Sequence, residues 1–107
     1  MVANVDAAIK ALGDPTRRAV FELIAGTSMS VGAIAERLPV SRPAVSQHLK
    51  VLKEAGLVVD RVAGTRRCYE VDPDGVDALR SYFERFWSTA LWAFKNAAEA
   101  ATKEEER

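Results

Sequence analysis

Residues 41–58 have the sequence SRPAVSQHLKVLKEAGLV, which predicts a single helix with a marked beginning and a marked end. Ser41 is a typical helix N-cap, because its hydroxyl accepts a hydrogen bond from a free backbone N–H of the first turn. Pro43 is tolerated within a first turn, where no intrahelical N–H bond is lost. Gly56 is the residue type that most often follows a last turn. We expect the function of the chain to depend on this helix.

The outward face of the helix is polar and lacks negative charge. At 100° per residue, Val45, Leu49 and Leu52 form one apolar stripe. The other side presents Pro43, Ser46, Gln47 and Lys50, and no carboxylate precedes residue 54. Hydrogen-bonding side chains without negative charge suit the base edges and phosphates of DNA. The pattern therefore favours a DNA-recognition helix over an ordinary amphipathic surface helix.

A shorter helix is predicted immediately upstream, over residues 31–38. Ser30 is a suitable N-cap, and Pro39 ends the helix because proline disfavours a helical conformation in the residue before it. Only Pro39 and Val40 then separate this helix from Ser41. Two helices joined so tightly turn sharply against each other, as in a helix-turn-helix, whose second helix enters the major groove of DNA.

A β-hairpin is predicted downstream, because residues 57–62 and 66–71 are rich in strand formers and flank Ala63-Gly64-Thr65. The side chains expected to contact DNA at or near its tip are Arg61, Thr65, Arg66 and Arg67. A basic hairpin beside a recognition helix is a wing, which contacts backbone phosphates or an adjacent minor groove. The alternative is a hairpin whose arginines are only solvated.

The charge of the chain is polarised along the sequence. The 107 residues include 15 Lys and Arg against 15 Asp and Glu, so the formal net charge is zero. Residues 41–67 nevertheless hold six basic and two acidic side chains, whereas residues 68–107 hold five basic and nine acidic ones. Such a molecule is steered towards DNA by one face and repelled by the other.

The remaining segments predict helices over residues 5–12, 16–25 and 73–101, the last two opened by Asp14-Pro15 and Asp72-Pro73. The last helix would be roughly 40 Å long, more than a domain of this size is wide, so part of it must project. The expected fold is mainly α with a small β-hairpin wing, in the order α-α-α-α-β-β-α. We expect one domain over residues 1–101 and a charged, frayed tail over residues 102–107.

The last helix carries more apolar surface than one small domain can cover, which predicts a two-fold homodimer. The candidate interface residues on its stripe are Leu79, Phe83, Phe86, Trp87, Ala90 and Phe94. The alternative is that these aromatic side chains line a ligand pocket. Trp92 falls on the opposite, polar face, where it either packs on an N-terminal helix or marks a surface for an effector or partner.

Taken together, these segments resemble the ArsR/SmtB family of bacterial winged-helix repressors over nearly the full length of the chain. The resemblance rests on LGDPTRR at 12–18, SRPAVSQHLKVL at 41–52, EAGLV at 54–58, and GTRR at 64–67 followed by Tyr69. It implies a homodimer formed through the first and last helices. It also implies that Arg42, Pro43, Ser46 and Gln47 lie at the groove, with Lys50 and the wing arginines nearer the phosphates.

The chain departs from the metal-sensing members of that family. Where those members carry a Cys-x-Cys type motif, residues 30–36 read SVGAIAE, and the predicted last helix contains no histidine. The whole chain has one His and one Cys, whereas transition-metal sites need several converging nitrogen or sulfur donors. The resemblance is therefore to metal-independent, autorepressor-like members, and we expect neither a metal nor another cofactor.

Two single residues have alternative roles. His48 lies beside the buried stripe of the recognition helix, which favours a packing role over a base contact. Cys68 alternates with Tyr69 in the second strand and points away from the expected core. A thiol near Arg66 and Arg67 suits a redox switch, but the chain has no second cysteine, which favours an inert residue.

The sequence predicts a dimeric repressor of its own or a neighbouring promoter, bound to double-stranded DNA at a pseudo-palindromic operator. No nucleophile motif, glycine loop or carboxylate pair indicates an enzyme. One alternative function is a winged-helix module that docks proteins through its aromatic last helix. Another is a regulator that responds to redox state through Cys68, or to a ligand in an interface pocket. Without a leader pattern or an apolar run of about 18 residues, a cytoplasmic protein with no membrane contact is expected.

Overall fold

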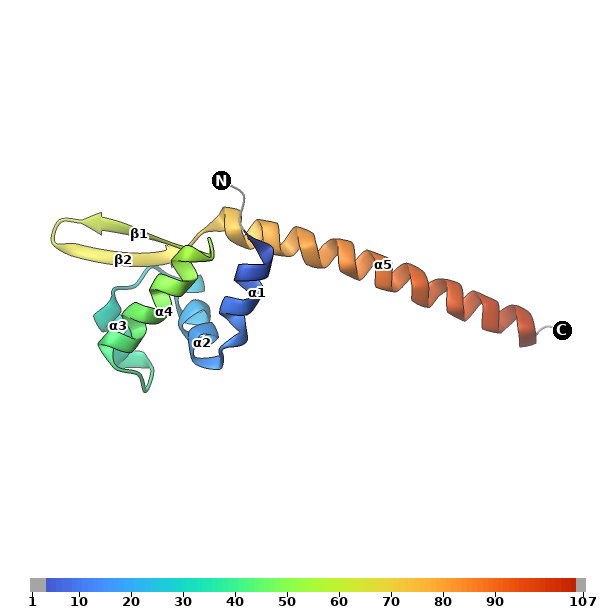
Figure 1. Ribbon diagram of the computed structural model, residues 1–107, viewed down its shortest axis with the longest axis horizontal. Coiled ribbons are helices and arrows are strands. Elements are labelled where there is room, and N and C mark those ends of the chain that lie inside the picture. The colour runs from blue at the N-terminus through green and yellow to red at the C-terminus, as the bar shows by residue number, and fades with distance from the viewer. Residues whose placement is uncertain (1–3, 106–107) are drawn as a thin grey trace.

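The computed structural model describes residues 4–105, which form five helices and a two-stranded antiparallel sheet in the expected order (Figure 1). The elements are α1 (Val5–Gly13), α2 (Pro15–Ala25), α3 (Val31–Arg37), α4 (Arg42–Glu54), β1 (Val58–Ala63), β2 (Arg66–Val71) and α5 (Pro73–Glu105). Helices α1 to α4 and the base of the β1–β2 wing form a globular head, from which α5 extends (Figure 1). None of the helices within residues 4–105 is long and apolar enough to span a membrane.

The first four helices begin where side-chain caps allow them to. The side chains of Asn4, Asp14, Ser30 and Ser41 each accept a hydrogen bond from a backbone N–H three residues further on. Each bond satisfies one of the free N–H groups of a first turn. The three helix starts predicted after Asp14, Ser30 and Ser41 are confirmed.

The end of α1 is capped by two arginines of α2. Arg17 donates through Nη1 to the carbonyl oxygen of Ala11 at 3.2 Å, and Arg18 donates through Nη1 to that of Leu12 at 3.3 Å. Carbonyl groups of a last helical turn have no intrahelical donor, so these bonds satisfy them and favourably place positive charge at the negative end of the helix. The LGDPTRR segment thus links α1 tightly to α2.

The hydrophobic core joins all the elements of the head. Its largest fully buried side chains are Val20, Ile24, Ile34, Val45, Leu49, Leu52, Leu57 and Val58. The predicted apolar stripe of α4 is confirmed, because Val45, Leu49 and Leu52 are each 0% exposed. Burying a side chain of this size contributes about 1.5–3 kcal/mol, so the stripe fixes which face of α4 is turned outward.

The wing differs from the prediction in its turn. Only Gly64 and Thr65 form the turn, and Ala63 pairs with Arg66, so the loop is one residue shorter than expected. Gly64 has φ +65°, the conformation that a type II′ hairpin turn requires at its first position. Met29 and Tyr69 also exchange two backbone hydrogen bonds, not predicted from the sequence, which tie β2 to the segment before α3.

The C-terminal end of α4 is the joint between recognition helix, wing and α5. Gly56 has φ 79°, and hydrogen bonds from Gly56 N to Lys53 O and from Leu57 N to Leu52 O complete a Schellman cap. The backbone of Leu57 also accepts a bond from Asp72 N at 2.9 Å, directly before α5. Gly75, in the first turn of α5, lies so close to Gly56 that a Cβ atom there would overlap the Gly56 carbonyl oxygen.

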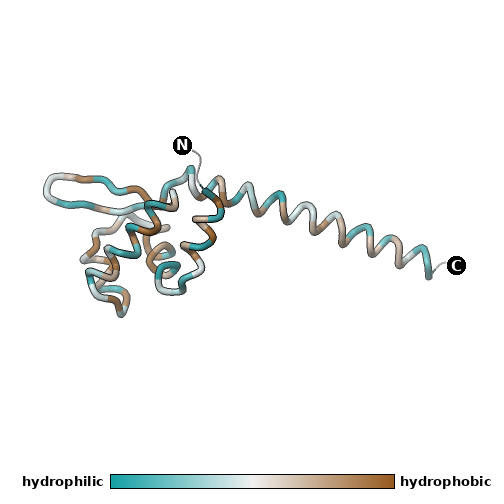
Figure 2. The backbone as a smooth tube through the Cα atoms, in the orientation of Figure 1, coloured by the Kyte–Doolittle hydropathy of each residue, from teal (hydrophilic) through white to brown (hydrophobic). Residues whose placement is uncertain are grey.

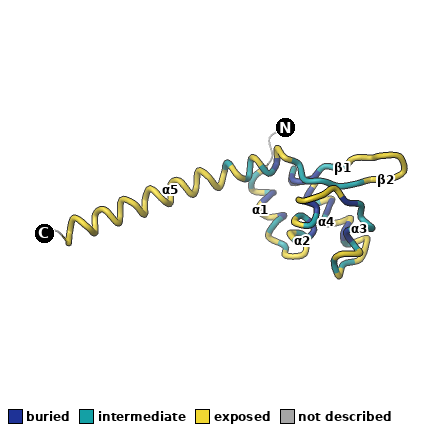
Figure 3. Tube along the Cα trace, turned by 180° about the vertical axis from the view of Figure 1, so that it is seen from behind, coloured by how far each residue is buried: buried dark blue, intermediate teal, exposed yellow. Residues whose placement is uncertain are grey.

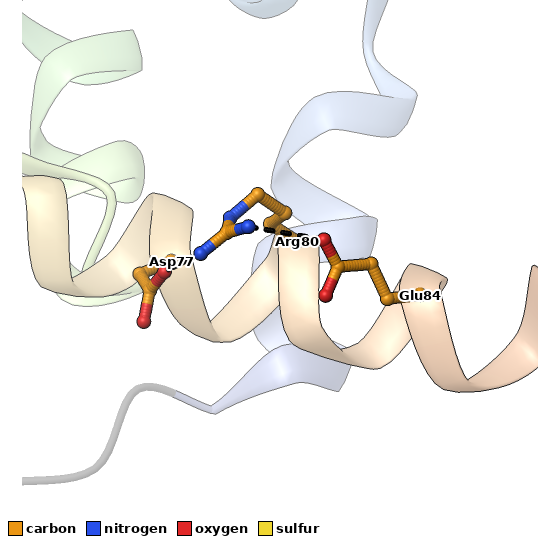
Figure 4. A network of polar contacts seen from close by, with 3 residues as sticks. All are labelled: Asp77, Arg80 and Glu84. Atoms are coloured by element: carbon orange, nitrogen blue, oxygen red, sulfur yellow. Dashed lines mark hydrogen bonds and ion pairs between the residues drawn. The ribbon is translucent and has the colours of Figure 1, made fainter.

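Helix α5 leaves the head after its first turns. Arg80 is paired along the helix with Asp77 and Glu84 at 2.7 and 3.0 Å, which raises the pKa of its guanidinium (Figure 4). From Tyr82 onward every described residue is exposed (Figure 3), and the structure measures 73 × 31 × 20 Å. Hydrophobic residues recur along this projecting part (Figure 2). The helix runs to Glu105 instead of ending near Ala101, because Lys103, Glu104 and Glu105 are residue types that favour helix. Residues 106–107 lie outside the described range.

The joint gives a prediction about stability. Gly75→Ala forces the start of α5 away from Gly56, so we expect a loss of roughly 1–3 kcal/mol in the free energy of unfolding, measured by urea denaturation. Gly13→Ala is the matched control, because a Cβ at Gly13 meets nothing within 4 Å and alanine favours the helical conformation. Equal unfolding midpoints for the two variants would contradict the close approach.

Candidate nucleic-acid interface

The outward face of α4 is presented to solvent as a continuous polar surface. All six side chains expected at the groove or beside it are exposed, namely Ser41, Arg42, Pro43, Ser46, Gln47 and Lys50. The buried stripe on the opposite side holds the helix against α2 and α3. No side chain of the head covers the polar face, so it has the shape and chemistry that a major groove accepts.

The segment between α3 and α4 sets the angle at which α4 is presented. Helix α3 ends at Arg37, and the following residue, Leu38, leaves the helical conformation with ψ 148°. A short-range bond from Val40 N to Leu38 O then tightens the link before the Ser41 cap. The two helices therefore turn within four residues, 38–41, as the helix-turn-helix interpretation requires.

Arg42 lies over α3 rather than extending freely. Its guanidinium would come within 3.0 Å of a Cβ built at Gly32, so the absence of a side chain at Gly32 leaves room for it. An open groove of about 530 Å³ runs between α3 and the wing, and its basic lining residues are Arg42, Arg66 and Arg67. The structure thus brings the first residue of α4 and two wing arginines to one groove, which the carboxylate of Glu36 on α3 also lines.

Other cations of the interface are already paired with carboxylates. Asp60, on β1 of the wing, has Oδ1 2.6 Å from Lys53 Nζ on α4 and Oδ2 3.3 Å from Arg67 Nη1 on β2. On the other face of the wing, Arg61 Nε is 2.6 Å from Glu70 Oε1. Two of the arginines predicted to contact phosphate are therefore ion-paired in the structure. Within residues 4–105, Arg42, Lys50 and Arg66 have no such partner.

The pairing at Asp60 affects its protonation. The hydrogen bond from Lys53 is the largest influence and lowers the pKa of the Asp60 carboxyl below its ordinary value of 3.8, with Arg67 adding a smaller electrostatic contribution. At neutral pH Asp60 is therefore a carboxylate. Its side chain is only 13% exposed.

His48 and Cys68 are both half-buried, as the position of His48 beside the stripe suggested, whereas Cys68 was expected to face away from the core and His48 was expected to be hydrogen-bonded. His48 is partly buried beside the α4 stripe, and its Nδ1 has no hydrogen-bond partner within residues 4–105. Cys68 lies opposite Arg61 in the wing and is the free cysteine of the chain. No group of three His, Cys, Asp or Glu side chains in the described range is arranged to hold a metal ion.

The candidate interface residues of α5 fall into two groups. Leu79 is half-buried and packs against the core of its own chain. The others lie on the projecting part, where Phe83, Phe86, Trp87 and Phe94 are 49%, 63%, 62% and 73% exposed and Ala90 is also exposed. Trp92 is 69% exposed and makes no packing contact with the core of this chain, so its alternative roles stay open.

The ion pairs of Lys53, Asp60 and Glu70 beside the candidate interface were not predicted from the sequence. A signal was present in the hairpin, since a two-residue turn at Gly64-Thr65 places Asp60 opposite Tyr69 and therefore diagonal to Arg67. The same register places Glu70 diagonal to Arg61. The three-residue loop expected from the sequence gave no such pairing.

The ion pairs predict a titration behaviour. Because the folded-state pKa of Asp60 is lowered, its pairing stabilises the fold fully above about pH 3.8 and is lost as the pH falls through the lower folded-state value. Lys53→Met should shift the pKa of Asp60 back towards 3.8, which NMR of the carboxyl carbon can follow. Arg66→Met is the control, and an Asp60 titration that Lys53→Met leaves unchanged would contradict the pairing.

Comparisons with known proteins agree with this geometry. Residues 12–61 match the family described as a helix-turn-helix domain. The HTH-type transcriptional regulator Rv2034 of Mycobacterium tuberculosis is 58% identical over 89 residues, which cover 83% of this chain and 83% of that protein. The transcriptional repressor SdpR of Bacillus subtilis is 44% identical over 55 residues, 51% of this chain and 61% of that protein.

A solved structure extends the likeness to the whole fold. It is the homodimeric winged helix-turn-helix DNA-binding domain of Mb0332 from Mycobacterium bovis, described as a possible ArsR-family transcriptional regulator. It is 30% identical, the match covers 86% of this chain and 82% of that one, and the TM-score is 0.63. On the evidence of its helix-turn-helix, its wing and these relatives, the chain belongs to the ArsR/SmtB family of winged helix-turn-helix transcriptional regulators.

Proposed function

We propose that the chain is a homodimeric repressor that binds a pseudo-palindromic operator through α4 and the wing, and that it needs no metal ion to do so. The observation that carries the proposal is the exposed face of α4, which is polar and has no carboxylate before Glu54 in the last turn, while Val45, Leu49 and Leu52 on the opposite face are fully buried. Gln47 and Ser46 supply groups that hydrogen-bond to base edges, and Lys50, Arg42 and Arg66 supply charge for phosphates.

The projecting part of α5 supports the homodimer. Its aromatic side chains are 49–73% exposed at Phe83, Phe86, Trp87 and Phe94, and an apolar surface of this kind needs a partner. A second copy covers it with a self-complementary surface, and the related Mycobacterium bovis domain is homodimeric. Two winged modules then bind half-sites about one turn of DNA apart, which doubles the contacts of one small module.

Repression follows from where such a dimer binds. A protein seated on both half-sites of an operator within a promoter excludes polymerase from that DNA, and one of the relatives is named a transcriptional repressor. The regulated promoter is the chain's own or a neighbouring one.

The small number of nitrogen and sulfur side chains that could bind a metal ion supports operator binding without metal. The chain has one His and one Cys, which lie on α4 and β2 and are not part of any three-donor cluster in the described range. Structural and sensory transition-metal sites draw on several nitrogen or sulfur ligands. Operator binding is therefore expected to be the same with a chelator and with added zinc.

The role of α4 predicts two different mutant phenotypes. Gln47→Ala should remove discrimination between operator and random DNA, at a cost of about 1–3 kcal/mol in binding free energy at the operator. Lys50→Ala should weaken binding to all sequences alike. Electrophoretic mobility shifts with the DNA upstream of the gene for this chain, and with a scrambled duplex, measure both effects.

Equal affinity of the unmutated chain for the upstream and scrambled duplexes would contradict sequence-specific recognition. It would favour the alternative of a winged module that docks proteins through α5. Glu22→Ala, an exposed change on α2, is the control that should alter neither affinity nor discrimination.

The dimer predicts a second phenotype that does not depend on DNA. Phe94→Glu places a charge in the apolar stripe and should convert the dimer into a monomer, as measured by sedimentation equilibrium. Asn96→Glu introduces the same charge on the polar side of α5 and should leave the dimer intact. A monomeric unmutated chain at micromolar concentration would refute the homodimer.

A further inference from the structure

The cations of the DNA-binding face differ in whether they are free to meet phosphate. Residues 41–67 contain six basic side chains. Three of them, Lys53, Arg61 and Arg67, are held by Asp60 or Glu70. The other three, Arg42, Lys50 and Arg66, are exposed and have no ion pair in the described part of the chain. The electrostatic charge offered to DNA is thus much smaller than the count of basic residues indicates.

We propose that Asp60 and Glu70 are internal counter-anions, which occupy three of the six cations and so limit how many DNA phosphates each protomer neutralises. The inference rests on the proposed DNA-binding function and goes beyond it, because it assigns two acidic residues a role in suppressing sequence-independent binding. Phosphate contacts supply most of the affinity for non-specific DNA, so the effect falls mainly on that binding.

Asp60 holds its two partners firmly because both of its oxygens are used and it is mostly covered. Its side chain is 13% exposed, and it links a helix to a strand, with Lys53 on α4 and Arg67 on β2. If both cations moved to phosphates, a carboxylate with little access to water would be left without a partner, which is costly. Salt also screens partly buried pairs less than exposed ones. The side chains of Lys53 and Arg67 are themselves 53% and 58% exposed, so the cover of Asp60 is what the proposal requires to keep these pairs in place when DNA approaches.

Glu70 holds its partner less firmly. Its side chain is 30% exposed, and that of Arg61 is 78% exposed, so water and salt compete with this pair more effectively. The two carboxylates nevertheless act in the same direction, because each lies within the wing and repels phosphates that its paired arginine would otherwise attract. Their effects should rank with Asp60 above Glu70.

The proposal has a quantitative signature in the salt dependence of binding. The slope of log affinity against log salt is about −0.9 for each phosphate neutralised on duplex DNA. A dimer with three free cations in each protomer should therefore give a slope of about −5. Freeing Lys53 and Arg67 in both protomers should steepen the slope to about −9, and freeing Arg61 alone should add about −2.

The test uses the full-length chain and a fluorescently labelled duplex of scrambled sequence, long enough for two half-sites, with anisotropy measured over a range of salt concentrations. Asp60→Asn should steepen the slope by up to about 4 and Glu70→Gln by up to about 2. Between roughly 200 and 50 mM salt, the advantage of Asp60→Asn over the unmutated chain should grow by up to about a hundredfold. The preference for the DNA upstream of the gene over the scrambled duplex should fall correspondingly.

Glu99→Gln is the control for net charge. It removes one negative charge from each chain at the exposed far end of α5, away from the wing (Figure 1). Its slope should match that of the unmutated chain. An equal steepening in Glu99→Gln and Asp60→Asn would overturn the proposal in favour of a general charge effect.

Two further outcomes also overturn the proposal. One is an unchanged slope for both wing variants, and the other is weaker binding by Asp60→Asn at an unchanged slope, which would make Asp60 a residue that only positions the wing. If Asp60→Asn fails to fold by circular dichroism, Glu70→Gln decides, because Glu70 lies away from the joint with α4. Failure of the unmutated chain to bind any duplex would refute the proposed function itself, whereas binding with unaltered variant slopes refutes only this inference.

Discussion

The arrangement of the whole molecule depends on the close contact of two backbones at Gly56 and Gly75. At this point α4 ends, the wing begins and α5 starts, and the hydrogen bond from Asp72 N to Leu57 O closes the junction. The elements that would contact DNA are therefore fixed to the helix that would contact a second copy. Any shift at Gly75 changes the angle of α5 and with it the distance between two recognition helices, which must match the spacing of half-sites.

Much of the fold could be predicted because its determinants are local. Cap residues such as Asp14 and Ser41 mark helix starts by their own hydrogen bonds, and the stripe of Val45, Leu49 and Leu52 follows from the helical period. The register of the wing could not be predicted so well, because one residue more or less in the turn changes every cross-strand pair. For that reason the partners of Asp60 and Glu70 appear only in the structure.

Contacts between distant segments were the other part beyond the reach of the sequence. Gly75 gave no local signal of its approach to Gly56, and Leu79 looked like its neighbours on the α5 stripe although it packs on its own core. The exposure of the α4 side chains was predicted better than the ion pairing of the wing side chains. The α4 residues depend on which side of one helix is buried, whereas the wing residues depend on pairing between two strands.

The two hydrogen bonds between Met29 and Tyr69 have a mechanical consequence. They clamp the base of the hairpin to the segment before α3, while every residue from Arg61 to Arg67 is exposed and free of the core. The part of the wing beyond the Met29–Tyr69 bridge is therefore expected to bend more easily than its base, since a segment with few buried contacts opens and bends at low cost. Bending of that part leaves the packing of α4 against α2 and α3 unchanged.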